Sequence, residues 1–267
     1  MGHLLGTDHQ KRNGKELNMA KQDRSYIGKG TIYLKALKAG IGLMPVGNCS
    51  ALEISFEEDK KEQKDYTSVG GGNVNVVSRI DSVTGSMTAL DLSADTMAPA
   101  LRAAVKNEAS GQVTDEVITA TGNDGELLPF AYAPDHTQAI TVKNAADDSG
   151  LTEGDDYTLT ANGLLVVGAG AITASGVKVS YTKAPQEILE AMVSAGEEFC
   201  LFFDGMNEAQ SGNPVSVTLH KVKFSPLQGL QLIGDEFAEV SMEFEVLRDS
   251  TKTGTGISQF MKVIQAL

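Results

Sequence analysis

The chain has 267 residues, of which 41% are hydrophobic and 21% charged, and its formal net charge at pH 7 is −13. That length suits one large domain or two small ones, each with a proper core. Residues 1–29 hold six basic and three acidic residues, so the remainder holds 16 basic and 32 acidic residues. A body this acidic is not expected to bind nucleic acid by neutralising phosphates.

Composition also limits the fold and the compartment. Aromatic residues make up 6% of the chain, Trp is absent and Gly reaches 28, a mixture typical of β-structure with many turns. The two cysteines, Cys49 and Cys200, lie far apart without metal-ligand spacing, so we interpret both as core residues. The polar first thirty residues do not resemble a signal peptide, and no apolar run is long enough to span a bilayer. We therefore expect a protein that is neither secreted nor inserted into a membrane.

The first part of the chain predicts two strands. Residues 1–29 have no amphipathic period and are expected to form an N-terminal arm. The alternation in Thr31–Leu37 indicates the first strand. In Val46–Glu58, apolar Leu52, Ile54 and Phe56 alternate with Glu53, Ser55 and Glu57, which predicts a second strand with one acidic face.

A long polar segment follows. Asp59–Asn75 is rich in charge at its start and in glycine at its end, and it has no face to bury. At about 17 residues it is long for a hairpin turn, so we expect either a mobile hairpin tip or a projecting loop that docks on another subunit. The three consecutive glycines are not followed by Gly-Lys-Ser/Thr, which argues against a phosphate-binding loop.

The next segment predicts a helix over Ser93–Asn107. Thr96 is placed to cap it and Pro99 to occupy its first turn, where a missing N–H costs little. Met97, Leu101 and Val105 recur at helical spacing, which predicts an apolar stripe that packs against a sheet.

Residues 113–183 change character and predict a compact β-module. Strands are expected at Ala139–Lys143, Tyr157–Ala161, Leu164–Val167 and Val177–Thr182, with Asn162-Gly163 as a tight turn. The acidic loops lack the pattern of a calcium-binding loop, so we interpret them as a solvated rim. Strands of the earlier type resume afterwards, which indicates that the module is an insertion.

The last part begins with a short helix predicted at Pro185–Ala195 and a buried strand at Phe199–Phe203. In Val215–Phe224 the apolar phase shifts, which predicts a one-residue bulge near His220-Lys221. The apolar tail that ends the chain follows a Thr/Gly-rich link and is expected to dock on something.

The clearest pattern in the chain lies in Asp235–Asp249. Apolar and polar residues alternate there with a period of two, and the polar positions are Glu239, Ser241, Glu243 and Glu245. A row of like charges on one strand face opposes folding. The acidic face is therefore either a solvated outer surface or the lining of a negative channel formed by many copies.

Catalytic chemistry is not expected. The four histidines are His3, His9, His136 and His220, and none has a Cys or a second His at metal-ligand spacing. The sequence has no nucleophile elbow and no GxGxxG motif opening a helix, and its facing glutamates lack a His, Arg or metal partner. We predict no enzyme activity, no cofactor and no metal site.

Several stretches together resemble the major tail tube proteins of tailed bacteriophages, chiefly those with long non-contractile tails. LEISFEEDKKEQKDYTSVGGGNV (52–74) looks like that family's acidic strand running into its long inter-ring loop. The segment 200–249, with LHKVKFSP, LIGDEFAEV and the final acidic strand in order, is the closer match. The module at 139–183, with LTEGDDYTL, GLLVV and VKVSYT, is similar to an insertion seen in part of the family.

The resemblance implies a mainly β fold, a tail-tube-type β-sandwich or barrel with a flanking α-helix, a long projecting hairpin loop and an inserted small β-module. It divides the chain into an N-terminal arm (1–29), the first part of the tube core (30–118), the module on the outer surface (119–184), the second part of the core (185–249) and a C-terminal arm (250–267). It implies six-membered rings that stack into a hollow virion tube, assembled in the host cytoplasm, through which DNA is ejected.

The resemblance also implies roles for particular residues and partners. Candidates for the channel lining are Glu53, Glu57, Glu239, Glu243 and Glu245. Candidates for contact with the adjacent ring are Lys60, Lys61, Lys64, Asp65, Tyr66, Gly70, Gly71 and Gly72. Candidates for arm contacts with neighbours are Arg24, Tyr26, Phe260 and Ile264. The implied partners are further copies of the chain, a tape measure protein in the lumen, tail terminator and distal tail proteins at the ends, and double-stranded DNA that passes without specific binding.

An alternative remains from another class. Residues 139–183 alone could belong to a small β-sandwich of the Ig-like type, which would suit a surface-exposed adhesion protein. The absence of a recognisable signal peptide argues against this alternative.

Overall fold

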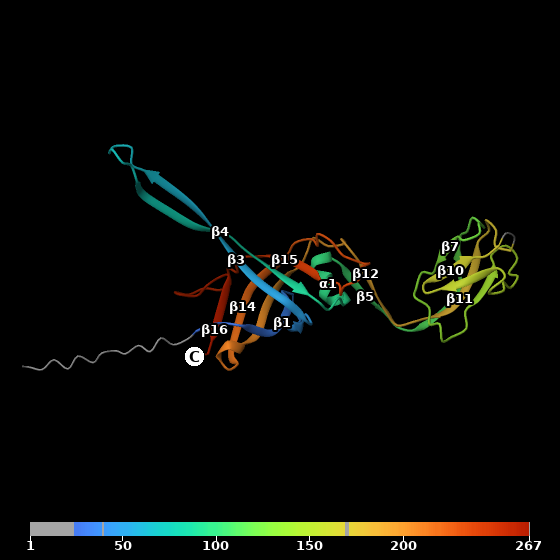
Figure 1. Cartoon of the computed structure of the whole chain (residues 1–267). Coiled ribbons are helices and arrows are strands. Elements are labelled where there is room, and N and C mark those ends of the chain that lie inside the picture. The colour runs from blue at the N-terminus through green and yellow to red at the C-terminus, as the bar shows by residue number, and fades with distance from the viewer. Residues whose placement is uncertain (1–23, 39, 169–170, 267) are drawn as a thin grey trace, which may run out of the picture.

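The computed structural model describes residues 24–38, 40–168 and 171–266, and it confirms a mainly β fold. Figure 1 shows a central β-structure from which a long hairpin projects on one side and a small β-module on the other. The elements in chain order are β1 (Gly28–Ala36), β2 (Met44–Pro45), β3 (Cys49–Lys64), β4 (Asn73–Ala89), α1 (Ala94–Leu101), β5 (Ala104–Glu108), β6 (Gly111–Ile118), β7 (Leu127–Pro129), β8 (Thr141–Asn144), β9 (Tyr157–Thr160), β10 (Gly163–Val166), β11 (Val177–Lys183), β12 (Gln186–Glu190), β13 (Glu198–Asn207), a short 3-10 helix (Glu208–Gln210), β14 (Asn213–Phe224), β15 (Val240–Val246) and β16 (Met261–Gln265).

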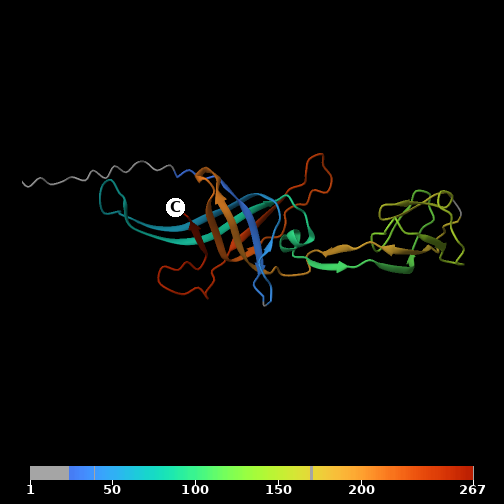
Figure 2. The same cartoon turned by 90° about the horizontal axis from the view of Figure 1, so that it is seen from below.

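The central structure is one eight-stranded antiparallel sheet with the order β2-β1-β13-β14-β15-β4-β3. Strand β14 pairs with β13 on one edge, and its other edge is shared by β16 and, further along, β15. Buried residues from β1 and from β4 belong to the same hydrophobic cluster, so the two halves of the sheet enclose one core. Sequential strands far apart in the chain therefore meet around that core (Figures 1 and 2).

The alternation in the acidic strand explains how β15 enters this core. Along β15 the side chains are strictly buried and exposed in turn, and the apolar residues point inward. Phe244 meets Phe224 edge to face at 5.6 Å between ring centroids, a geometry that adds about 0.5–1.5 kcal/mol to the burial itself. The predicted bulge at His220-Lys221 is confirmed, because the β13–β14 register shifts by one residue there.

The projecting hairpin is formed by the outer halves of β3 and β4. The prediction of a loop at Asp59–Asn75 is wrong in its local structure, since the strand pairing continues to Lys64 opposite Asn73. The turn spans Asp65 to Gly72, whose backbone atoms form an N–H···O bond of 2.7 Å. Valines 74, 76 and 77 favour extended backbone, and this local preference outweighs the lack of a buried face.

The predicted helix at Ser93–Asn107 is shorter than expected and is capped differently. Helix α1 ends at Leu101, where Arg102 adopts a left-handed conformation with φ of 50°. Its cap is Ser93, whose Oγ accepts a hydrogen bond from the Thr96 N–H at 3.2 Å. The Thr96 hydroxyl instead donates to the Val46 carbonyl at 2.8 Å, which ties the helix to the sheet.

The helix predicted at Pro185–Ala195 is also replaced by a strand. Residues 186–190 form β12, which pairs antiparallel with β5 in a two-stranded ribbon. This pairing joins segments about 80 residues apart and overrides the local helical pattern on both sides, including that of Val105. Glu108, at one end of the ribbon, forms ion pairs with Lys106 and Lys183.

The ribbon leads into the module, which has its own core. Two three-stranded sheets, β7-β10-β9 and β6-β11-β8, pack around a second hydrophobic cluster that includes Tyr181 and Leu164. Because β6 starts at Gly111, the module begins earlier than the boundary predicted at residue 119. The predicted Asn162-Gly163 turn lies one residue earlier, because Gly163 already pairs in β10, where the Leu128 carbonyl leaves no room for a Cβ.

The two ends of the chain differ in what can be compared. Most of the predicted N-terminal arm lies outside the described residues. The prediction of a free C-terminal arm at 250–267 is wrong for its last part, because β16 pairs with β14. Phe260 and Met261 pack against the chain's own core, which explains the apolar character of this segment.

The close packing of β4 on β15 generates a stability prediction. A Cβ built at Gly85 would lie 2.5 Å from Phe244 Cζ and 2.6 Å from the Glu53 carbonyl oxygen. We expect Gly85→Ala to lower the free energy of unfolding by about 1–3 kcal/mol through overpacking. Denaturant unfolding measures this, with Gly42→Ala as the control because a Cβ there meets nothing within 4 Å. Equal stability of both variants would contradict the packing argument.

Candidate channel and assembly surfaces

A continuous polar surface covers the outward side of β3, β4 and β15. Cross-strand pairing puts Glu53 opposite Ser86 and Ser86 opposite Glu243, so these three side chains form a row. The next row contains Ser55, Thr84 and Glu245. We call this surface the polar face, and its members are Glu53, Ser55, Glu57, Ser82, Thr84, Ser86, Thr88, Ser241, Glu243 and Glu245.

The middle strand of the polar face carries hydroxyls rather than charges. Four alternate residues of β4, from Ser82 to Thr88, are Ser or Thr, and they separate the carboxylates of β3 from those of β15. Ser82 Oγ donates a hydrogen bond to Glu57 at 3.0 Å. This spacing reduces the repulsion that directly opposed carboxylates would suffer. A hollow of about 310 Å³ lies between Glu53 and Glu243.

Basic residues are scarce on the polar face. Among the described residues, the ion pairs of the sheet join Lys221 to Glu198 and Lys38 to Glu197, away from β3 and β4. Lys223 lies opposite Glu245 in the β14–β15 register and borders the surface on one side. Glu243 accepts a hydrogen bond from the side-chain amide of Gln228 at 3.1 Å. The face therefore offers oxygen atoms and negative charge, with little to attract an anion.

The structure groups three of the five candidates for the channel lining. Glu53, Glu243 and Glu245 lie together around β4, and Glu57 continues the face toward the hairpin. Glu239 is exposed but precedes β15, so strand pairing does not bring it into the group. Sequence reasoning missed the hydroxyls of β4, although their strict alternation from Ser82 to Thr88 was a readable signal.

The inter-ring candidates all lie on the outer hairpin. The three lysines are on β3 and exposed, and Tyr66 at the turn is 88% exposed. Gly70, Gly71 and Gly72 all have positive φ (114°, 61° and 150°), which explains the need for glycine in this turn.

The side chain of Asp65 organises the same turn. It accepts hydrogen bonds from the Thr67 N–H at 2.7 Å, the Thr67 hydroxyl at 2.6 Å and the Ser68 hydroxyl at 2.6 Å. These bonds, that of Ser68 first, lower the pKa of Asp65 to about 2. The tip is thus a defined turn rather than an irregular loop.

The arm-contact candidates lie on the chain's own sheet. Buried Asn207 holds the segment before β1: its Oδ1 accepts from the Ile27 N–H and its Nδ2 donates to the Ser25 carbonyl, both at 3.0 Å. Arg24 and Tyr26 flank this anchor and are exposed. Ile264 on β16 is also exposed. Phe260 is not a free arm residue, because it packs against the core.

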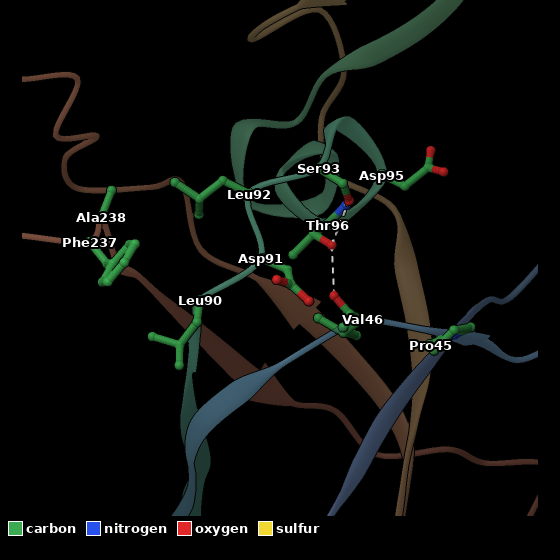
Figure 3. Close-up of a pocket in the computed structure, with 11 residues that line it drawn as sticks. Pro45, Val46, Leu90, Asp91, Leu92, Ser93, Asp95, Thr96, Phe237 and Ala238 are labelled. Carbon is green, nitrogen blue, oxygen red and sulfur yellow. Dashed lines mark hydrogen bonds between the residues drawn. The ribbon is translucent and has the colours of Figure 1, made fainter.

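The largest surface hollow has no catalytic set. It measures about 620 Å³ and lies between β2, the start of α1 and the segment before β15 (Figure 3). Its carboxylates are Asp91, which accepts from the Asn48 N–H at 2.7 Å, and Asp95. Two carboxylates without an imidazole or cation beside them do not make an acid/base pair. Phe237 lies at the rim.

Two further searches bear on function. Among the described residues, His, Cys, Asp and Glu do not gather into groups of three or more that could hold a metal ion. Within the same residues, no helix has both the length and the apolar character needed to cross a bilayer.

The lowered pKa of Asp65 yields a pH prediction. Because the pKa in the folded turn is about 2, below the ordinary 3.8, its contribution is fully present above about pH 4 and is lost as the pH falls through 2. We expect the carboxyl carbon of Asp65 to titrate near pH 2 in an NMR titration. In Asp65→Asn the amide signals of Thr67 and Ser68 should shift at neutral pH. A midpoint near 3.8 would show that the hydrogen bonds do not persist in solution.

Comparison with known proteins places the chain in a family without assigning it an activity. No curated protein matches the sequence. One family matches residues 25–264, which include the central sheet, the hairpin and the module. The chain therefore belongs to the family described as "Protein of unknown function UCP028589".

Proposed function

We propose that the chain is the tail tube subunit of a tailed bacteriophage, forming stacked six-membered rings around a channel for DNA. The polar face carries this proposal. It presents carboxylates and hydroxyls over three neighbouring strands while the opposite side of the same strands holds the core. The tail tube resemblance of the sequence supplies the ring geometry and the class of virion.

The chemistry of the polar face suits a conduit for a polyanion. Glu53, Glu243 and Glu245 offer DNA phosphates no counter-charge, so DNA gains no affinity from counterion release. At physiological ionic strength charges are screened beyond about 8 Å, so repulsion acts mainly on phosphates close to the wall. The hydroxyls of β4 keep the surface wet without adding charge. DNA would pass such a wall without being held.

The outer hairpin supports the assembly part of the proposal. An isolated two-stranded hairpin is at best marginally stable in water. Here β3 and β4 run beyond the core with exposed side chains on both faces from Glu58 to Lys64. A partner surface on another subunit would stabilise it. Contacts between different surfaces of identical subunits close into rings or continue as filaments, the two geometries that a stacked tube needs.

In this proposal the module occupies the outside of the tube. The β5–β12 ribbon carries it away from the central sheet, on the side opposite the hairpin (Figures 1 and 2). The channel would contain a tape measure protein before DNA passes, and terminator and distal tail proteins would cover the tube ends. The virion would be the site of function after assembly in the host cytoplasm.

Charge reversal tests the channel role. We expect Glu53→Lys, Glu243→Lys and Glu245→Lys together to leave tubes able to form but to slow DNA ejection, because lysines in the wall would bind phosphates. Ejection kinetics from assembled particles at several salt concentrations measure the effect. The control reverses Glu153, Asp155 and Glu187, which are exposed on the module and ribbon. Ejection as fast as in the control variant would exclude the polar face as the channel wall.

An adhesion protein is the second candidate, favoured by the separate core of the module. Replacing residues 109–185 by Asn-Gly should close the ribbon, because Glu108 and Gln186 already pair and a two-residue turn fits antiparallel strands. Under the tube proposal this variant still forms hollow tubes, seen by negative-stain microscopy. Persistent monomers of the full chain, combined with module-dependent binding to cell surfaces, would favour adhesion instead.

A further inference from the structure

The hairpin carries an apolar stripe that leaves the core with the strands. Leu52 and Ile54 of β3 pack against the core, and the same face of the ladder continues with Phe56, Ile80 and Val76. These three side chains are 63%, 60% and 48% exposed. Apolar residues on one face of a projecting ribbon indicate a surface that another molecule covers.

A second apolar surface lies in the connection between β14 and β15, residues 225–239, here called the β14–β15 loop. Leu232, Ile233 and Phe237 are 83%, 93% and 98% exposed. The loop is attached at its start, where the Leu227 N–H donates to the Ala100 carbonyl at 3.0 Å. It therefore presents large side chains from a fixed position beside α1.

The two surfaces have opposite charge. Residues 60–79 of the hairpin contain four basic and two acidic residues, a surplus of +2 in a chain whose total is −13. The β14–β15 loop contains Asp235, Glu236 and Glu239 and no basic residue, a charge of −3. Complementary charge around apolar contacts steers association and fixes the register of the contact.

Their positions exclude a contact within one chain. The hairpin tip projects from one end of the central sheet, and the β14–β15 loop lies at the other end, next to α1 and the ribbon (Figures 1 and 2). We propose that the outer hairpin of one copy docks, through its Val76 and Ile80 face, on the β14–β15 loop of a second copy. Such a head-to-tail contact repeats along an axis. The inference rests on the proposed function for its role as the contact between rings.

Charge also selects this loop over the other exposed apolar segment of the core. The connection between β1 and β2 exposes Leu37, Ile41 and Leu43, at 45%, 40% and 45%. Its charged residue is Lys38, which a positively charged hairpin would repel. The β14–β15 loop is both more exposed and acidic, so it is the better receiving surface.

Cysteine cross-linking of the full chain tests the contact. Val76 and Val77 are adjacent, similarly exposed (48% and 46%) and on opposite faces of the hairpin, so they form a matched pair. Under mild oxidation, Val76→Cys with Ile233→Cys should give a ladder of cross-linked multimers, whereas Val77→Cys with Ile233→Cys should remain largely monomeric on non-reducing gels. Mixing the Val76→Cys and Ile233→Cys single variants should give dimers only.

A charge exchange provides the second measurement. We expect Lys60→Glu with Lys64→Glu, or Asp235→Lys with Glu236→Lys, to weaken self-association about tenfold by sedimentation, and the four changes together to restore it. Hollow tubes without the Val76–Ile233 ladder would overturn this contact and leave the tube proposal standing. A ladder with solid filaments would support the contact and overturn the tube. A full chain that stays monomeric and gives no ladder would overturn both.

Discussion

The pairing of β4 on both edges is the constraint from which the rest of this structure follows. β4 pairs with β3 on one side and β15 on the other, so its side chains are fixed in register with two acidic strands. Its inward residues Val83, Met87 and Ala89 are buried in the core, and its outward residues are hydroxyls. A one-residue slip would put those hydroxyls into the core and expose the methionine. The register that stabilises the core therefore also builds the polar face.

The same strand determines where the core ends and the hairpin begins. The β3–β4 register shifts between Glu57 and Glu58, leaving Asp81 as an extra residue on β4. Bulges increase local twist and bend the strand that carries them. Beyond this point no other strand pairs with either partner among the described residues, and every side chain except the turn residue Asp65 is exposed. Folding energy is concentrated on one side of the bulge, and the surface available for assembly lies on the other.

Sequence reasoning succeeded where burial follows a local period and failed where pairing is remote. The alternation in β15 predicted its two faces because each side chain's environment depends on its immediate neighbours. The ribbon of β5 and β12 was predicted as two helices, because Val105, Ile188 and Leu189 recur at helical spacing. Nothing local reveals that these segments pair across the intervening module. For the candidate site, the glutamates were recognisable as acidic strand faces, but their meeting around Ser86 depends on a strand order that the sequence does not encode locally.

The exposed surfaces make sense if the cost of ordering them is met during assembly. An exposed hairpin fixes the backbone of some twenty residues, and each costs about 1–2 kcal/mol in conformational entropy before any contact offsets it. Cross-strand hydrogen bonds alone return little of this in water, because the unfolded strands bond to water instead. Burial of Phe56, Val76 and Ile80 against a second copy would contribute about 25 cal/mol for each Å² removed from water. The core and the module, each with its own hydrophobic cluster, do not need that contribution. Docking can thus order the hairpin without altering the fold that presents it, so assembly and subunit stability can vary independently.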